Sequence, residues 1–302
     1  MYRLIPVRDF PEKRVGEEFV RMGAMMPERS RPMKRHLVIG WVLVLAAGTA
    51  LVPFSAFGSG ARAAPEFTFT VRELKKVTAS LPKGVQDRIL AAPQAFLHLL
   101  AQVLDQPAEY LALVDKRHLL DAGYVPPDLV SLGDYPLAVS RKDLFLRKAI
   151  MPDVLAMAAA ARADGVTILF SSSYRSYDYQ KAVYEREVQT YGQAAADRES
   201  AHPGASQHQL GTAVDFGSIT DEFAGTKAGR WLSAHAWEYG FTLSYPRAYE
   251  EVTGYRWESW HYRYIGRPAA RLQREFFGDV QQYLLEFLND HRTALEAARV
   301  RR

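Results

Sequence analysis

The chain has 302 residues, 48% hydrophobic and 24% charged, an ordinary composition for one large globular domain or two small ones. It contains no cysteine, which excludes a disulfide framework, a thiol nucleophile and cysteine-ligated zinc. Residues 1–62 hold 10 of its 38 Lys and Arg but only 5 of its 34 Asp and Glu, leaving 28 basic and 29 acidic residues elsewhere. This balance gives no reason to expect nucleic-acid binding.

The first 64 residues have the order of a targeting segment. A polar, Arg-rich and Lys-rich stretch leads into an uncharged apolar run from Leu37 to Phe57, and small residues follow. This order predicts a secretory signal cleaved after an A-x-A site at Ala61 and Ala63. An uncleaved membrane anchor is the alternative, because the run is nearly long enough to span a bilayer. In either case we expect the rest of the chain to be exported to the periplasm or another extracytoplasmic location. We expect only this segment to contact the membrane. Three other methionines are alternative starts: Met25, Met26 and Met33.

Helical patterns flank the central part of the chain. Apolar residues at helical spacing predict an accessory helical segment at 65–108 and a helical extension at 269–302. His98 lies among the apolar residues of the first segment, so we interpret it as a structural histidine. The residues suited to chemistry lie between these segments, at 109–268.

Within 109–268, short strands alternate with helices. We expect, in chain order, a strand at 110–114, a helix at 141–164, a strand at 166–170, a helix at 178–190, a loop at 190–204, a short strand leading into Asp215, a helix at 229–239 and strands at 241–244 and 260–265. This order predicts one α+β domain, a small and mainly antiparallel sheet with helices packed on one side and a site on the open face.

Two stretches carry candidate metal ligands. His208 and Asp215 lie seven positions apart, on a loop and on the strand after it. Imidazole and carboxylate are zinc ligands, and a catalytic zinc needs three protein ligands and one open position. His261 is the best third candidate, because Glu258, three residues before it, is placed to handle a proton on metal-bound water.

Two further residues near these stretches have competing interpretations. Arg175 follows the strand predicted at 166–170, where a side chain points into a site at the strand ends. Its planar fork suits a carboxylate or an oxyanion, although a surface salt bridge is the alternative. His202 is interpreted as a solvent-facing loop histidine rather than a fourth metal neighbour.

Three motifs, in this order, resemble the VanY-type D-alanyl-D-alanine carboxypeptidases. These zinc peptidases are related to the vancomycin-resistance D,D-dipeptidases and share the hedgehog fold. The motifs are S-Y-R-S-Y-x-x-Q from Ser173, P-G-x-S-x-H-Q-x-G-x-A-x-D from Pro203, and E-x-W-H-x-R-Y from Glu258. The resemblance covers roughly 112–266. It departs mildly at Ser173 and Ser259, where the family often has Gly and Pro.

The resemblance implies a catalytic domain at 109–268 with one zinc per chain, which removes the terminal D-alanine from peptidoglycan stem peptides. The implied site residues are the zinc ligands His208, Asp215 and His261, the catalytic base Glu258, the transition-state stabiliser Arg175, and the substrate-pocket residues Gln180 and Ser206. L,D-carboxypeptidase or endopeptidase activity on the same wall peptides, and a non-catalytic zinc-containing wall-binding module, are the alternatives. The absence of H-E-x-x-H and of Lys-Thr-Gly excludes thermolysin-like and serine-type peptidases.

The spacing of Glu258 and His261 makes a structural prediction. Side chains three apart in a regular strand point to opposite faces. If both residues face one metal, the chain must turn or bulge at Glu258 and Ser259, with the strand starting near Trp260. His261 and Arg263 then lie on one face.

Overall fold

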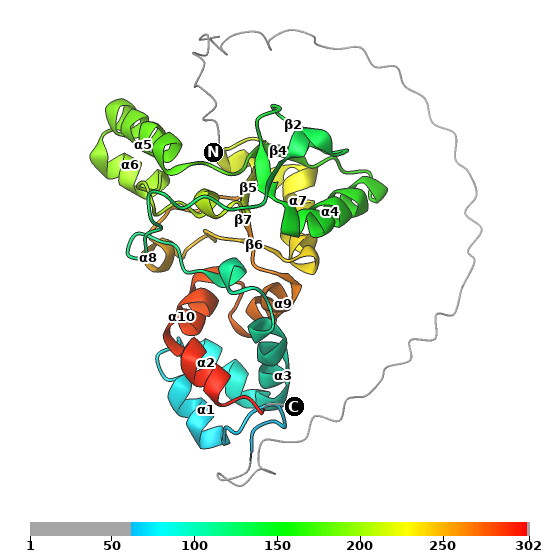
Figure 1. Ribbon diagram of the computed structural model, residues 1–302, viewed down its shortest axis with the longest axis vertical. Coiled ribbons are helices and arrows are strands. Elements are labelled where there is room, and N and C mark those ends of the chain that lie inside the picture. The colour runs from blue at the N-terminus through cyan, green and yellow to red at the C-terminus, as the bar shows by residue number, and fades with distance from the viewer. Residues whose placement is uncertain (1–61, 301–302) are drawn as a thin grey trace, which may run out of the picture. The chain divides into compact units, whose positions relative to one another are not determined.

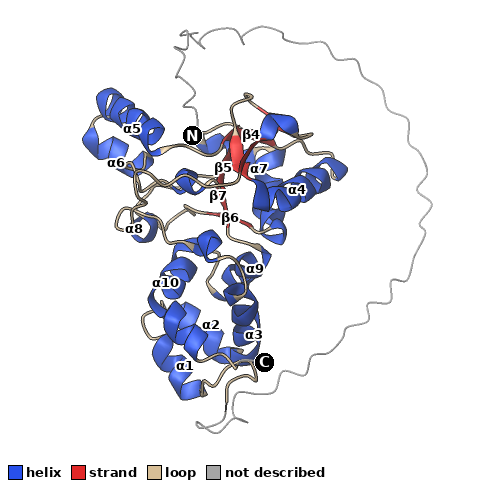
Figure 2. Cartoon of the chain, in the orientation of Figure 1, coloured by secondary structure: helices blue, strands red, loops and turns tan. Residues whose placement is uncertain are grey.

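The computed structural model describes residues 62–300 (Figures 1 and 2). The predicted leader, its apolar run and the alternative start methionines lie outside these residues. Within the described part of the chain, no helix combines the length and apolar character needed to cross a membrane. The division into 65–108, 109–268 and 269–302 stays a prediction.

A five-stranded sheet positions the candidate site. Its strand order is β2 (Ala138–Val139), β4 (Leu169–Ser172), β5 (Ala213–Phe216), β7 (His261–Tyr264) and β6 (Phe241–Leu243). All neighbouring pairs are antiparallel except β2 and β4. A separate antiparallel pair joins β1 (Leu129–Ser131) to β3 (Phe145–Arg147). The predicted α+β fold with a mainly antiparallel sheet is confirmed.

The register of the central strands places the candidate ligands on one face of the sheet and apolar core residues on the other. Asp215 on β5 lies opposite His261 on β7, so the two side chains share a face. Their sequence neighbours point the other way, as the period of two requires. Phe216 there packs edge-on against Phe170 and Tyr262, with ring centroids 5.1 and 5.7 Å away. Every residue of β5 and β7 is buried, so both faces of these strands are covered.

Helices lie to either side of the sheet in Figure 1. The helices α4 (Met151–Ala163) and α7 (Lys227–His235) lie to the right in that view, and α5 (Tyr177–Tyr191) and α6 (Gln193–Glu199) lie to the left. Ser176 caps α5 by accepting a hydrogen bond from the amide of Tyr179. The one-turn helix α8 (Glu250–Thr253) follows β6.

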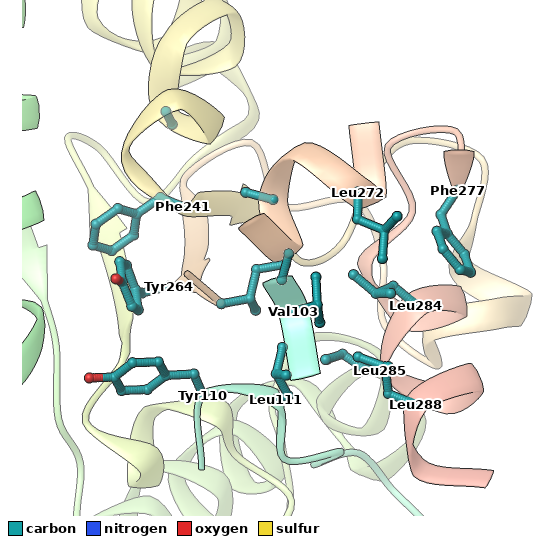
Figure 3. Packing of buried hydrophobic residues seen from close by; sticks show 14 of the residues in the cluster. Val103, Tyr110, Leu111, Phe241, Tyr264, Leu272, Phe277, Leu284, Leu285 and Leu288 are labelled. Carbon is teal, nitrogen blue, oxygen red and sulfur yellow. The ribbon is translucent and has the colours of Figure 1, made fainter. Parts of the chain in front are cut away.

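The flanking segments form a helical region below the sheet in Figure 1. It contains α1 (Val71–Val77), α2 (Lys83–Ala91), α3 (Pro93–Leu104), α9 (Arg267–Phe276) and α10 (Gln281–Ala297). The ring of Phe96 on α3 lies 5.3 Å from that of Phe276 and 6.1 Å from that of Phe287, which ties the two ends of the chain together. Figure 3 shows apolar side chains of these helices packed next to Phe241 and Tyr264 of the sheet, so the core is continuous.

Four element predictions need correction. Residues 110–114 are not a strand, because Pro107 opens a 3-10 turn, Ala108–Leu111, whose apolar residues insert into the core. The helix expected at 141–164 begins only at Met151, with Pro152 in its first turn, and β3 pairs with β1 before it. The strand expected at 166–170 runs from Leu169 to Ser172, and the loop at 190–204 contains α6.

Candidate metal centre

The loop before β5 places His208. This residue lies in a one-turn 3-10 helix, Gln207–Leu210, and the hydroxyl of Ser206 accepts a hydrogen bond from its backbone amide. Gly211 ends the turn in the left-handed conformation, with φ of 68°. A Cβ there would lie 3.0 Å from a methyl of Leu129 and 3.1 Å from Arg147, so glycine suits both the backbone angle and the space.

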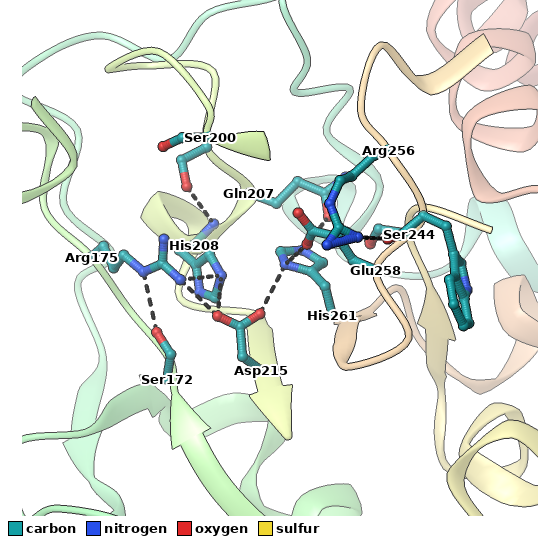
Figure 4. A network of polar contacts seen from close by, with 12 residues as sticks. Ser172, Arg175, Ser200, Gln207, His208, Asp215, Ser244, Arg256, Glu258 and His261 are labelled. Carbon is teal, nitrogen blue, oxygen red and sulfur yellow. Dashed lines mark hydrogen bonds and ion pairs between the residues drawn. The ribbon is translucent and has the colours of Figure 1, made fainter. Parts of the chain in front are cut away.

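The structure brings the three predicted ligands together in a buried cluster (Figure 4). His208, Asp215 and His261 each offer a ligand atom within 4.8 Å of the others. Nε2 of His208 lies 3.2 Å from Oδ2 of Asp215, and Nδ1 of His261 lies 3.0 Å from Oδ1. Oδ1 is buried and accepts no hydrogen bond of normal geometry, which leaves it available to a cation.

Hydrogen bonds behind the histidines orient their rings. Nδ1 of His208 donates to the carbonyl oxygen of Ser173 at 2.7 Å, and Nε2 of His261 donates to Oε1 of Gln207 at 3.2 Å. Each imidazole therefore turns its other nitrogen, which carries a lone pair, toward Asp215. This is the arrangement of metal-ligating histidines.

Glu258 reaches the same cluster from a turn. Ser259 and Trp260 form the turn, and the strand begins at His261, which confirms the predicted break. The Oε2 atom of Glu258 lies 3.6 Å from Nδ1 of His261. Burial, with the negative charge of Asp215 nearby, raises the pKa of Glu258 well above its usual range. A carboxyl group whose pKa is raised is suited to exchanging protons near neutral pH.

Arg175 contacts the cluster from the turn after β4. Its Nη2 lies 2.7 Å from Oδ2 of Asp215 and 3.1 Å from Nε2 of His208, and its Nε donates to the hydroxyl of Ser172. The side chain is 19% exposed, which excludes the surface salt bridge considered as an alternative. Burial and the charge of Arg175 lower the pKa of His208 to about 4, so its imidazole is neutral. Burial alone would raise the pKa of Asp215, but the contacts around its carboxylate, the positive charge of Arg175 among them, hold that pKa well below the usual range.

The remaining predicted residues have distinct places. Gln180 on α5 is buried, accepts from Nη1 of Arg175 at 3.3 Å and donates to the carbonyl oxygen of Ala201, so it holds Arg175 in position at the pocket wall. Ser206 lines the pocket and caps the His208 turn. His202 is half exposed and lies 3.0 Å from Asp197, outside the metal cluster, as interpreted from the sequence.

A pocket of about 440 Å³ opens over the cluster. Its wall includes aromatic and charged side chains that the sequence analysis did not identify: Tyr245, Tyr255, Arg256 and Trp260. The ring of Tyr245 lies 4.8 Å from that of His261. The neighbouring Gln207 was also missed. The position of Gln207 directly before the predicted ligand His208 was the one signal in the sequence that could have identified it. Only the fold shows that the amide of Gln207 faces His261.

Comparison with known proteins agrees with this geometry. Residues 143–267 match the VanY family, described as D-alanyl-D-alanine carboxypeptidase. The carboxypeptidase-like protein YodJ of Bacillus subtilis is 34% identical over 190 residues, which cover 60% of this chain and 69% of YodJ.

Two solved structures are similar. That of the LdcB LD-carboxypeptidase has a TM-score of 0.54 and 33% identity, covering 61% of this chain and 88% of LdcB. That of a vancomycin-resistance D,D-pentapeptidase VanY mutant in complex with Zn(II) has a TM-score of 0.50 and 33% identity, covering 60% of this chain and 99% of that chain. The chain with its three motifs and buried His–Asp–His cluster belongs to the VanY family of D-alanyl-D-alanine carboxypeptidases.

Proposed function

We propose that this protein is a zinc-dependent D,D-carboxypeptidase that removes the terminal D-alanine from peptidoglycan stem peptides. The observation that carries the proposal is the buried cluster of His208, Asp215 and His261 with Glu258 and Arg175 at its edge. Two imidazoles and one carboxylate are a donor set that suits zinc. The family match and the Zn(II)-bound VanY structure support the same cofactor.

The protein's own groups have distinct tasks in this chemistry. When bound, zinc would polarise the scissile carbonyl and acidify a water molecule. Glu258 would take the proton from that water and deliver it to the leaving amine of D-alanine. Arg175, held by Ser172 and Gln180, would donate to the oxyanion or to the substrate carboxylate. The surrounding burial strengthens these interactions by excluding water.

L,D-carboxypeptidase activity is the second candidate, because the similar LdcB structure is described as an LD-carboxypeptidase. A non-catalytic wall-binding module is disfavoured, because such a module needs neither a buried base nor a cation beside the metal ligands. Endopeptidase cleavage inside a cross-link is tested by the experiment described next.

The experiment incubates the purified protein, loaded with zinc, with three defined muropeptides: a pentapeptide, a tetrapeptide and a cross-linked dimer. The proposal expects release of D-alanine from the pentapeptide, with the released amino acid identified by chirality. Release from the tetrapeptide would establish L,D-specificity instead, and separation of the dimer would establish endopeptidase action. No release from any substrate, with zinc bound, would favour the binding module.

We also infer that the catalytic part acts outside the cytoplasm, since the wall substrate lies there and residues 37–57 resemble an export segment. Cell fractionation, with sequencing of the mature N-terminus, tests export and cleavage together. Recovery of the full-length chain only in the cytoplasm would contradict the inference.

A further inference from the structure

A buried chain of polar side chains leads from His261 to the first residue of α10. The Oε1 atom of Gln207 accepts from Nε2 of His261 at 3.2 Å and from the hydroxyl of Ser244 at 2.7 Å. The Nε2 atom of Gln207 donates to Oε1 of Gln281 at 3.4 Å. Nε2 of Gln281 donates to the hydroxyl of Thr242 at 2.7 Å. None of these five side chains belongs to a residue more than 5% exposed.

The direction of each hydrogen bond follows from the next one along. The amide nitrogen of Gln281 donates to the hydroxyl of Thr242 and, at 3.4 Å, to its carbonyl oxygen, which can only accept, so Gln281 turns its oxygen toward Gln207. Gln207 must then present its own nitrogen to Gln281 and its oxygen to His261. An oxygen at that position selects the tautomer of His261 with a proton on Nε2, which leaves the Nδ1 lone pair facing Asp215.

The opposite orientation of the Gln207 amide would harm a metal site. Its nitrogen would then donate to Nε2 of His261, and the imidazole proton would move to Nδ1, the atom nearest Asp215. A protonated nitrogen has no lone pair for a metal. The side chain of Gln281 therefore influences which nitrogen of the metal ligand His261 carries the proton, although it does not contact His261.

We propose that Gln281 is a positioning residue, which sets the amide orientation of Gln207 and through it the ligating tautomer of His261. The proposal rests on the metal centre of the proposed function. It also gives the C-terminal helical extension a role in the site, because Gln281 lies beyond the segment 143–267 that matches the family. Partners of metal-ligating histidines typically contribute 10-fold to 100-fold to metal affinity, and we expect about 10-fold for this more remote residue.

The neighbouring Gln282 offers a matched control. It is the same residue type on the same helix and is 6% exposed, but it donates to Asp115 and Glu286 rather than toward the metal cluster. Gln281→Met and Gln282→Met each replace the amide by an apolar group of similar length. Zinc affinity, measured by chelator competition, should fall about 10-fold in Gln281→Met and stay unchanged in Gln282→Met, whatever each does to thermal stability.

A second variant, Gln207→Glu, separates the effect of amide orientation on zinc affinity from the effect of general packing. Gln207→Glu presents an acceptor to His261 whichever way the group turns, because both carboxylate oxygens accept. Adding Gln281→Met to Gln207→Glu should therefore cause no further loss of zinc affinity. An equal 10-fold loss in both backgrounds, or equal losses in Gln281→Met and Gln282→Met, would overturn the proposal while leaving the zinc enzyme intact. Failure of the unsubstituted protein to bind zinc would instead overturn the proposed function.

Discussion

Replacing Glu258 by glutamine should separate the chemistry of the site from its architecture. The amide keeps the shape of the side chain and leaves the three ligands unchanged, so zinc content should stay the same. It cannot accept the proton of the attacking water, so turnover on a D-alanyl-D-alanine peptide should fall at least about 100-fold, or roughly 2.7 kcal/mol in the activation free energy. Turnover near that of the unsubstituted enzyme, with normal zinc content, would show that another residue is the base.

The same substitution should stabilise the metal-free protein. Burial and Asp215 raise the folded-state pKa of Glu258 well above its ordinary value of 4.5, so the charged form is disfavoured in the folded state. The stability that the neutral carboxyl group contributes is complete below pH 4.5 and is lost as the pH rises toward the folded pKa.

At pH 7 in excess chelator, Glu258→Gln should therefore have a higher free energy of unfolding than the unsubstituted protein. The difference should shrink as the pH falls to 4.5, and denaturant titrations at the two pH values measure it. A variant less stable than the unsubstituted protein at pH 7 would refute the placement of Glu258 in a buried, repulsive environment.

The remaining predictions concern the ligands, the cation and the core. Tight zinc binding should be lost in each of three variants, His208→Ala, Asp215→Ala and His261→Ala; turnover at full rate in excess chelator would contradict the zinc assignment. Arg175→Lys keeps the charge but not the planar fork, so turnover should fall about 10-fold or more with zinc content unchanged; an unaltered rate would remove Arg175 from the mechanism. Gly211→Ala places a side chain at a φ of 68° against Leu129, and denaturant unfolding should show a loss of about 1 kcal/mol or more. Phe96→Ala should cost about 3–5 kcal/mol, because its ring packs between α9 and α10, and a loss below 1 kcal/mol would mean that these helices do not share one core.

Local sequence patterns were sufficient to predict part of the structure of this protein. The spacing of Glu258 and His261 predicted a turn before β7, because alternation in a strand forbids both side chains from facing one metal. The helices at both ends and the strand that carries Asp215 also follow from apolar periodicity. The pattern failed at 110–114, where Pro107 and packing in the core favour a 3-10 turn over the strand that the apolar run suggests.

Only the tertiary structure decided how these residues meet. The register of β5 against β7 places Asp215 opposite His261, and the loop closed by Gly211 brings His208 to the same point. The contact between Arg175 and Asp215 spans 40 positions, and the link from Gln207 to Gln281 spans 74. Local propensity carries no information about such contacts, because they form only when strand register and helix packing bring distant side chains into one buried space.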